Sequence, residues 1–374
     1  EAWKAAVRPN TKAFLVESPA NPLLEVTAIG AVAEIAHAAG AKLVVDNVFA
    51  TPLLQKPLTL GADVVVYSCT KHMDGQGRVL GGGGSINSQV FTRGVAEDYD
   101  NWVTDFGCEG WSADEVNRYF VRSESNSRLS APHHGTQGPL GVSDLLRPHK
   151  LSEAFVKAGQ EYGLPYNSDF NGAEQYGVGF YQTTTKNGRR CSAAVAYLKP
   201  ARNRPNLTVR ANVTVSRVII KNGRAVGLQA IEGGSVRTYS ANREVIISAG
   251  AFGSPKLLQL SGIGDPEDLA AVGIETVHAL PGVGKNLHDH CDVDIVYELK
   301  DYHSMDRFNQ VRPATVMAGV EYLAFRSGPF ASTLVEAGGF SYANKDEKTP
   351  DLQFHFLPAA RAATAAEALK PGFG

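Results

Sequence analysis

An aspartate and a lysine, Asp46 and Lys71, each follow a short apolar run near the start of the chain. If both runs are neighbouring parallel strands, the two side chains lie at one edge of a sheet, where α/β proteins bind ligands. A buried carboxylate can keep a pyridinium nitrogen protonated, and a lysine amine can form a Schiff base with an aldehyde. Pyridoxal phosphate (PLP) requires both functions from its protein, and the hydroxyls of Ser68 and Thr70 could bind its phosphate. Strand-end Asp and surface Lys residues are also common without any such role.

A second stretch with chemical potential is "REVIISAGAFGSPKLLQLSGIG", far along the chain. We predict a buried strand over residues 244–249, a turn of small residues, and a helix that begins near Ser254. Small residues at such a turn let a cofactor approach the backbone closely. The helix N-terminus would favour the negative charge of a pyrophosphate. An ordinary strand-turn-helix crossover has the same pattern, so both interpretations stay open.

The elements around these residues follow from hydrophobic periodicity. Residues 1–80 alternate short apolar runs with helical segments, which predicts a parallel α/β sheet. Residues 123–150 are rich in Ser, Pro, Gly and His, which predicts a long loop or lid. Residues 207–220 and 224–232 alternate apolar and polar side chains around a Lys-Asn-Gly turn, which predicts an antiparallel hairpin turning at Asn222-Gly223.

Composition narrows the class of protein. The chain has 374 residues, 43% hydrophobic and 20% charged, with a formal net charge of −2. This balance gives no reason to expect nucleic acid or an anionic membrane as a partner, and no apolar run is long enough to span a bilayer. Four cysteines without a CxxC pair favour a reducing, cytoplasmic compartment. Both ends look cut, and the oligomeric state stays open.

The histidines offer little sign of a metal site. His133 and His134 fall in the predicted loop, while His288 and His290 flank an aspartate. A lone His-x-His pair supplies too few ligands for a structural metal, so we predict none. His355 lies in a strand-like run and is expected to be a wall residue rather than a base.

The first 82 residues resemble the cysteine/methionine-metabolism family of PLP enzymes. The resemblance is carried by "ESPANPLLEV" and "LVVDNVFATPLLQKPLTLGADVVVYSCTKHMDGQGRVLGG". It implies Lys71 as the Schiff-base lysine and Asp46 as the partner of the pyridine nitrogen. It also implies Asn21 near the phenolic oxygen of the cofactor, with Ser68 and Thr70 at the phosphate. The glycine-rich phosphate loop, stacking Tyr and substrate-binding Arg of that family are not found in this sequence.

From about residue 78 onward the chain resembles the glucose-methanol-choline (GMC) oxidoreductases, most closely their choline- and alcohol-dehydrogenase-like members. The resemblance is carried by "GRVLGG…SIN", "DFNGAEQYGVGFYQTTTKNGRRCSAAVAYLKPARNRPNLTV", "VIISAGAFGSPKLLQLSGIG" and "LPGVGKNLHDH". It implies a flavin adenine dinucleotide (FAD) enzyme that removes hydride from the CH–OH group of a small-molecule alcohol. It implies these FAD-binding residues: Arg78, Val79, Gly81, Gly82, Ser85, Asn87, Val215, Gly250 and Ser254.

Two departures from the GMC pattern affect the expected activity. Gly83 and Gly84 stand where the family usually has Ser, and no GxGxxG occurs anywhere in the chain. The catalytic His of the family is expected in a later segment that these 374 residues do not contain. We therefore expect no alcohol-dependent turnover from this chain.

The hexamer "GRVLGG" belongs to both resemblances and marks the junction between them. The predicted fold class is α/β. Residues 1–82 form a parallel α/β fragment of a PLP-dependent transferase fold, and residues 83–374 form a partial, Rossmann-like FAD-binding domain with an α+β substrate domain. Three hypotheses follow: an FAD-dependent alcohol dehydrogenase, a PLP-dependent transsulfuration fragment, or a fusion, natural or artefactual, without enzymatic function.

Overall fold

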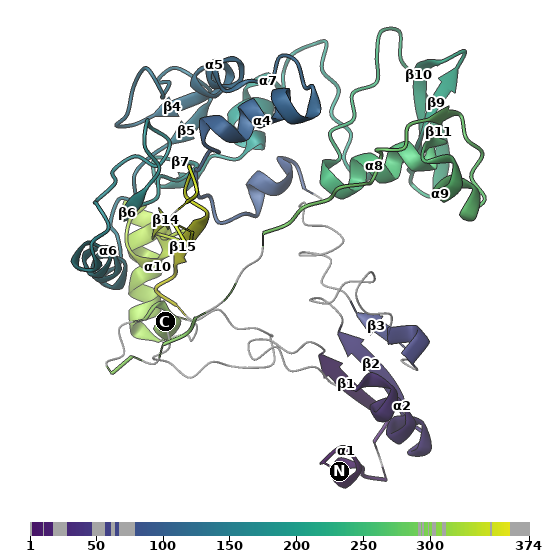
Figure 1. Ribbon diagram of the computed structural model, residues 1–374, viewed down its shortest axis with the longest axis horizontal. Coiled ribbons are helices and arrows are strands. Elements are labelled where there is room, and N and C mark those ends of the chain that lie inside the picture. The colour runs from purple at the N-terminus through teal and green to yellow at the C-terminus, as the bar shows by residue number, and fades with distance from the viewer. Residues whose placement is uncertain are drawn as a thin grey trace. The chain divides into compact units, whose positions relative to one another are not determined.

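The computed structural model describes most of the residues of the chain, with gaps between the described segments (Figure 1). The described residues are 2–9, 11–17, 28–46, 57–60, 64–66, 79–290, 293, 295–297, 299–300, 304–308, 312–344 and 346–359. They belong to two compact units. Unit 1 comprises residues 1–78 and 205–293, and unit 2 comprises residues 79–204 and 294–374.

The N-terminal part of unit 1 is a small parallel sheet. Its strands lie in the order β1 (Ala13–Glu17), β2 (Lys42–Asp46) and β3 (Val64–Val66), and helix α2 (Ile29–Ala38) connects the first two. The first helix, α1, is Ala2–Ala6. The predicted parallel arrangement of these strands is therefore confirmed.

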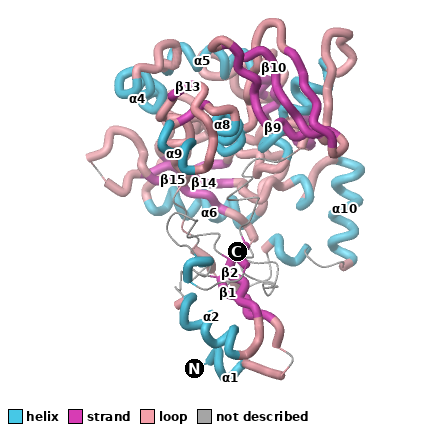
Figure 2. Tube along the Cα trace, turned by 90° about the vertical axis from the view of Figure 1, so that its right-hand side faces the viewer, coloured by secondary structure: helices cyan, strands magenta, loops and turns pink. Residues whose placement is uncertain are grey.

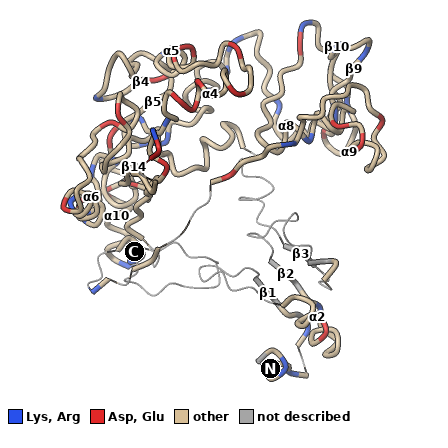
Figure 3. Tube along the Cα trace, in the orientation of Figure 1, with Lys and Arg blue, Asp and Glu red and all other residues tan. Residues whose placement is uncertain are grey.

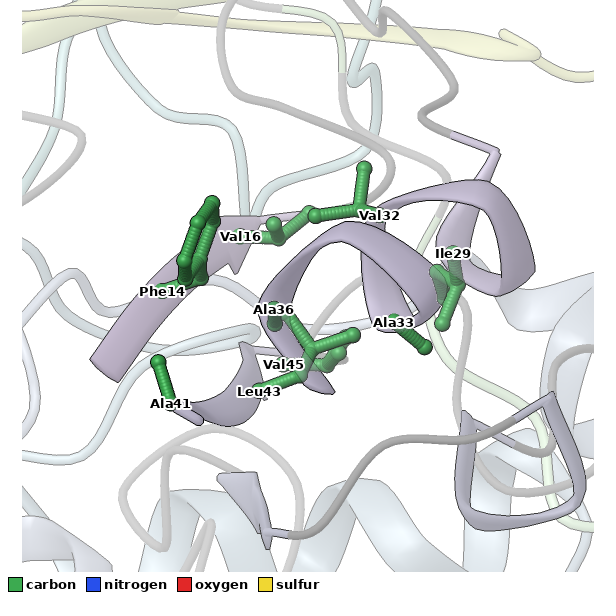
Figure 4. Packing of buried hydrophobic residues seen from close by; sticks show 9 residues of the cluster. All are labelled: Phe14, Val16, Ile29, Val32, Ala33, Ala36, Ala41, Leu43 and Val45. Carbon is green, nitrogen blue, oxygen red and sulfur yellow. The ribbon is translucent and has the colours of Figure 1, made fainter. Parts of the chain in front are cut away.

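Buried aliphatic side chains hold this small sheet to α2 (Figure 4). Leu43 and Val45 on β2 are fully buried, and Val32 and Ala36 on α2 are almost completely buried. Each buried Val or Leu side chain stabilises the fold by about 1.5–3 kcal/mol. The apolar face of α2 is thus the surface that covers the sheet.

An antiparallel sheet forms the second part of unit 1. Strands β9 (Val213–Lys221), β10 (Arg224–Glu232) and β11 (Ser235–Ser240) lie in the order β11-β10-β9. Figure 2 shows β9 and β10 side by side as magenta strands. The predicted hairpin is confirmed, although its first strand begins at Val213 rather than at residue 207. Asn222 and Gly223 have φ values of 52° and 72°, the left-handed conformation that a tight two-residue hairpin turn requires.

The predicted buried strand at residues 244–249 is wrong. These residues are described and form no strand, and the side chain of Ile246 is 77% exposed. A strand requires a hydrogen-bonded neighbour, and none of the described strands pairs with this run. An apolar sequence makes burial of its side chains favourable, but it does not provide the neighbouring strand that its backbone would have to pair with.

Helix α8 (Gly250–Leu260) follows and begins four residues before the predicted start near Ser254. The Oγ of Ser254 accepts a hydrogen bond of 3.0 Å from the backbone N–H of Ala249, which holds the first turn. The hydroxyl of Ser261 accepts one of 2.8 Å from the backbone N–H of Val218, which fastens α8 to β9. The remaining described elements of unit 1 are the 3-10 helix η1 (Pro57–Leu60), β12 (Ile263–Gly264), α9 (Pro266–Ala271) and β13 (His278–Ala279).

Unit 2 is centred on an antiparallel sheet in the order β15-β14-β6. These strands are β6 (Gly177–Phe180), β14 (Ala337–Ser341) and β15 (Leu352–Phe356), and helix α6 (Lys150–Tyr162) packs on them through Val156. Tyr181, Phe170 and Phe340 form a second core cluster. The other helices are α4 (Ala96–Phe106), α5 (Ala113–Ser123), α7 (Lys199–Ala201) and α10 (Pro313–Phe325).

The region predicted as a long loop or lid, residues 123–150, contains short regular structure. Strands β4 (Glu124–Asn126) and β5 (Leu140–Val142) pair in parallel, and the nearby β7 (Thr185–Lys186) and β8 (Arg189–Arg190) form a small ribbon. The backbone approaches itself closely here, because a Cβ at Gly135 or Gly138 would clash with the α5–β4 backbone. Apart from these two short strands most of the region is irregular, as the loop prediction has it, and its glycines pack closely against the backbone of α5 and β4.

Candidate functional site

The predicted flavin loop is a compact turn in unit 2. Gly81 adopts φ 94° and precedes a short 3-10 helix, η3 (Gly82–Ser85). The Oγ of Ser85 donates a hydrogen bond of 2.8 Å to the carbonyl of Leu80, and the backbone N–H of Asn87 donates one of 2.9 Å to Gly83. These contacts give the loop one defined conformation although it is rich in glycine.

This loop has a packed side and an open side. A Cβ on Gly81 would clash with the Oγ of Ser85 and lie 2.9 Å from the backbone nitrogen of Ala194. An added Cβ at Gly82 or Gly83 meets no atom of the described structure within 4 Å. Bare backbone therefore faces open space at these two glycines, where a flat ligand could approach.

Arg190, at the end of β8, fastens the far end of the loop. Its Nη1 donates to the carbonyl of Gly84 at 3.2 Å, to the carbonyl of Asn87 at 2.7 Å and to the side-chain oxygen of Asn87 at 2.9 Å. Asn87 is thus held from both backbone and side chain. Sequence reasoning missed Arg190, because nothing local links it to a loop about a hundred residues earlier.

The other predicted FAD residues divide between the two units. Val215 lies on β9 of unit 1 and is 37% exposed. Gly250 is the first residue of α8, with φ 82°, and Ser254 lies in its first turn. Val79 belongs to unit 2 and is half exposed.

Most of the residues predicted to bind PLP lie outside the described residues. Asn21, Ser68, Thr70 and Lys71 lie outside the described residues, as does Arg78 of the flavin loop. Asp46 is the last residue of β2, which pairs with β3 in parallel. The predicted strand-end position of Asp46 is therefore confirmed.

A buried ionic network that the sequence did not indicate joins Arg93, a few residues after the flavin loop, to Glu124, His134 and Asp169. His134, 2% exposed, bonds through Nδ1 to Glu124 at 2.8 Å and through Nε2 to Asp169 at 3.1 Å. Both ring nitrogens must carry a proton to donate to two carboxylates, so His134 is an imidazolium here. Arg93 pairs with the other oxygen of Glu124 at 2.5 Å.

The ionisation of these groups follows from their contacts. Burial by itself would lower the pKa of His134, but the hydrogen bonds to Asp169 and Glu124 outweigh it and raise that pKa to about 9. Burial tends to raise the pKa of Glu124 and of Asp169, yet the bond from His134 leaves both pKa values below their usual range. All of these groups are therefore charged near neutral pH.

The network continues through amide side chains. The Nδ2 of Asn126 donates to Glu124 and to the side-chain oxygen of Gln182, both at 2.7 Å. Gln182 in turn donates to Asp144 at 2.7 Å, which pairs with Arg128 at 2.6 Å. A continuous chain of hydrogen bonds thus joins His134 to the Arg128 ion pair.

Gln182 links this network to the flavin loop. The backbone carbonyl of Gln182 accepts a hydrogen bond of 2.8 Å from the backbone N–H of Phe91. Two residues later, the backbone N–H of Thr184 donates one of 2.8 Å to the backbone carbonyl of Gln89. Residues 182–184 are thereby hydrogen-bonded to residues 89–91, which follow the loop. The residues that directly follow the loop are thus joined by backbone hydrogen bonds to the segment that carries Gln182.

Comparison with known proteins defines the class. The GMC oxidoreductase family model matches residues 58–292, and the chain belongs to this family. The model of the Cys/Met metabolism PLP-dependent enzymes matches residues 1–98. Both resemblances predicted from the sequence are confirmed, and the two matches overlap around the "GRVLGG" junction.

Particular relatives agree with the GMC assignment. The chain is 41% identical over 301 residues to oxygen-dependent choline dehydrogenase 1 of Chromohalobacter salexigens, covering 79% of this chain and 53% of that protein. It is 42% identical over 289 residues to the oxygen-dependent choline dehydrogenase of Brucella anthropi, covering 76% and 51%. The chain thus spans about half the length of these relatives.

A solved structure shows the same fold. A formate oxidase crystal structure superposes with a TM-score of 0.72 at 22% identity, covering 97% of this chain and 72% of that one. The fold is therefore that of a GMC oxidoreductase, with α/β content. Among the helices that the structure describes, none has the length and apolar character that crossing a bilayer requires.

Proposed function

We propose that the chain is part of an FAD-dependent alcohol dehydrogenase that oxidises the CH–OH group of a choline-like alcohol. Flavin would accept the hydride. The loop at residues 79–87, with its open backbone side and its fastening by Arg190, is the observation that carries this proposal. Relatives at 41–42% identity that are named choline dehydrogenases support the choice of alcohol.

The residues present fit parts of such a cofactor. Gly82 and Gly83 leave their backbone accessible, and Asn87 has an orientation fixed by Arg190. In unit 1, the N-terminus of α8 at Gly250 offers backbone N–H groups and a favourable dipole for a pyrophosphate. The other residues proposed to hold FAD are Ser254 and Val215 of unit 1, together with Arg78, Val79, Gly81 and Ser85.

FAD binding is the readout that tests this proposal, because the catalytic His is expected outside these residues. A Gly83→Val variant adds a side chain to the open side, where φ is not positive and no described atom lies within 4 Å. We expect the loop to stay folded and FAD affinity to fall about tenfold. Ser88→Val, at an exposed residue just after the loop, is the matched control and should bind FAD as the unaltered chain does.

Titration of the purified chain with FAD, followed by flavin fluorescence, measures both affinities. Circular dichroism of each variant checks that it has folded. Equal affinity in Gly83→Val and the unaltered chain would refute the proposed role of the loop. An unaltered chain that takes up no FAD at all would refute the flavoprotein assignment.

The PLP hypothesis keeps one specific observation in its favour: Asp46 ends a strand beside a parallel neighbour, within the region that the PLP-enzyme family model matches. We propose, as the second candidate, a fragment similar to O-succinylhomoserine sulfhydrylase that holds PLP through Lys71. Borohydride reduction after incubation with PLP, followed by peptide mass spectrometry, should label Lys71 and not Lys12. A chain that binds neither cofactor would leave the third hypothesis, a fusion without enzymatic function.

A further inference from the structure

Unit 2 contains a cavity of about 460 Å³ that none of the flavin-loop residues 79–87 lines. It lies between the N-terminal turns of α4 and α5, the segment at residues 170–176 and the segment that follows β14. The volume is within the range of small-molecule sites, about 300–1,000 Å³. The proposed flavin chemistry makes no use of this cavity, so the class of its ligand has to follow from the wall.

Arg93 has the one buried charged side chain among the described residues that line the cavity, and it is 7% exposed. Its Cζ lies 5.0 Å from the ring centroid of Phe120, and its Nη1 lies 3.5 Å from the side-chain oxygen of Asn117. The same Nη1 donates a hydrogen bond of 2.6 Å to the carbonyl of His133. Because Phe120, Asn117 and His133 all line the cavity, the guanidinium is part of its wall.

One hydrogen-bond donor of this guanidinium is unused. Nη2 bonds to Glu124 at 2.5 Å and Nη1 to the carbonyl of His133, but the Nε–H is buried and has no acceptor within the described structure. A buried donor without a partner costs about 1–3 kcal/mol. The Nδ2 of half-buried Asn117 also has no partner among the described residues. Two neighbouring donors therefore favour a ligand that supplies a hydrogen-bond acceptor.

The charges of the ionic network behind this wall cancel. Arg93 and His134 are positive, and the carboxylates of Glu124 and Asp169, to which they bond, are negative. An anion in the cavity would meet no uncompensated positive charge, and a cation would lie beside a guanidinium. An uncharged ligand avoids the desolvation cost of either ion.

The acidic side chains at this cavity lie at its exposed margin. The acids of α4 and α5 are the red segments of these helices in Figure 3. Glu97, Asp114 and Glu174 line the cavity and are exposed, as is Lys348 with the opposite charge. Exposed charges are screened by water and salt, so these groups contribute little to affinity. Their carboxylates can still accept a hydrogen bond from a ligand.

Aromatic rings make up much of the remaining wall. Tyr99 and Phe120 come from α4 and α5, with ring centroids 5.8 Å apart. Tyr176 and Tyr342 come from the other two segments, with centroids 5.4 Å apart. Aromatic rings pack favourably against one another in offset or edge-to-face arrangements. The wall therefore favours a ligand with a ring of its own.

We propose that this cavity binds an uncharged aromatic carboxamide. Its carbonyl oxygen would accept hydrogen bonds from the Nε–H of Arg93 and from the Nδ2 of Asn117, while its ring would lie against the aromatic wall. Its amide N–H groups could donate to the exposed carboxylates at the margin. The proposal is independent of FAD, and its test does not require flavin.

Benzamide, benzoate and benzylamine are probes of similar shape that separate the acceptor from the charge. Benzamide has an acceptor and no charge, benzoate has an acceptor and a negative charge, and protonated benzylamine has no acceptor. Titration of the full chain at neutral pH, followed by saturation-transfer NMR, measures the three affinities. Benzamide should bind about threefold to tenfold more tightly than either of the others.

Asn117→Asp keeps the shape of the side chain and removes its N–H donors. It should weaken benzamide binding about threefold to tenfold. Asn101→Asp, the same change at an exposed residue of α4 that does not line the cavity, is the matched control and should leave the affinity unchanged. Arg93→Lys keeps a positive charge beside Glu124 but has no Nε–H, and it should cause a loss of similar size. Circular dichroism checks the folding of each variant.

Benzoate or benzylamine binding as tightly as benzamide would overturn the proposal. So would equal benzamide affinities of Asn117→Asp and Asn101→Asp, because the donor of Asn117 would then play no part. If Arg93→Lys does not fold, the comparison of these two Asn variants decides alone. Because FAD is absent from every arm, none of these results bears on the flavin proposal.

Discussion

Replacing His134 by glutamine tests whether the buried ionic network stabilises unit 2 through a charged imidazole. The glutamine amide would keep a hydrogen-bond donor but lose the positive charge between Glu124 and Asp169. The pKa of His134 is raised from 6.5 to about 9 in the folded chain. A raised pKa means that the stabilisation is fully present below pH 6.5 and is lost as the pH rises through about 9.

The expected loss of stability follows from the size of the pKa shift of His134. About 2.5 pH units, at about 1.4 kcal/mol per unit, correspond to about 3 kcal/mol of unfolding free energy. The bonds that produce it are those of 2.8 Å to Glu124 and 3.1 Å to Asp169. We therefore expect His134→Gln to lower the stability of unit 2 by about 3 kcal/mol at about pH 6. The difference should shrink above about pH 9.

Urea unfolding at several pH values measures this profile. Trp102 and Trp111 report on unit 2, while Trp3 belongs to unit 1, so a Trp3→Phe background isolates the signal. His133→Gln is the matched control, because only the backbone carbonyl of His133, and not its side chain, takes part in the hydrogen bonds around Arg93.

The reasoning would be refuted if the difference in unfolding free energy between the unaltered chain and His134→Gln stayed the same from about pH 6 to about pH 9. So would a loss of stability in His133→Gln as large as that in His134→Gln. Either result would mean that the imidazole is not held charged by Glu124 and Asp169.

Two further predictions concern other parts of the fold. Glu336, 1% exposed, accepts hydrogen bonds from the His149 N–H and from two Ser hydroxyls. Glu336→Ala should therefore lower the unfolding free energy of unit 2 by about 1–3 kcal/mol in urea, whereas the exposed Glu153→Gln on α6 should change it little. In the β9–β10 turn, Gly223→Ala places Cβ in open space at φ 72°. It should cost about 1 kcal/mol of local stability, measured by faster amide hydrogen exchange in the hairpin; unchanged exchange would contradict the turn assignment.

Local patterns in the sequence were sufficient for several elements. The apolar runs "AKLVVDN" and "DVVVYSCTKH" predicted parallel strands, since a short β-branched run that is buried on both faces is typical of such sheets. The Asn222-Gly223 pair predicted the hairpin turn, because both positions require positive φ. Motif wording also identified both families before any contact was known. These signals succeed because they depend on neighbours in the chain.

The tertiary structure alone decided the rest. His134 has the composition of a polar loop around it, yet it becomes a buried imidazolium because Glu124 and Asp169 arrive from 10 residues before and 35 residues after it. Arg190 reaches Asn87 across 103 residues. Conversely, residues 244–249 are apolar enough for a buried strand and remain exposed, since no described strand pairs with them. The burial of a side chain and the pairing of a strand depend on which distant segments of the chain come together. Hydrophobic periodicity does not indicate which segments these are.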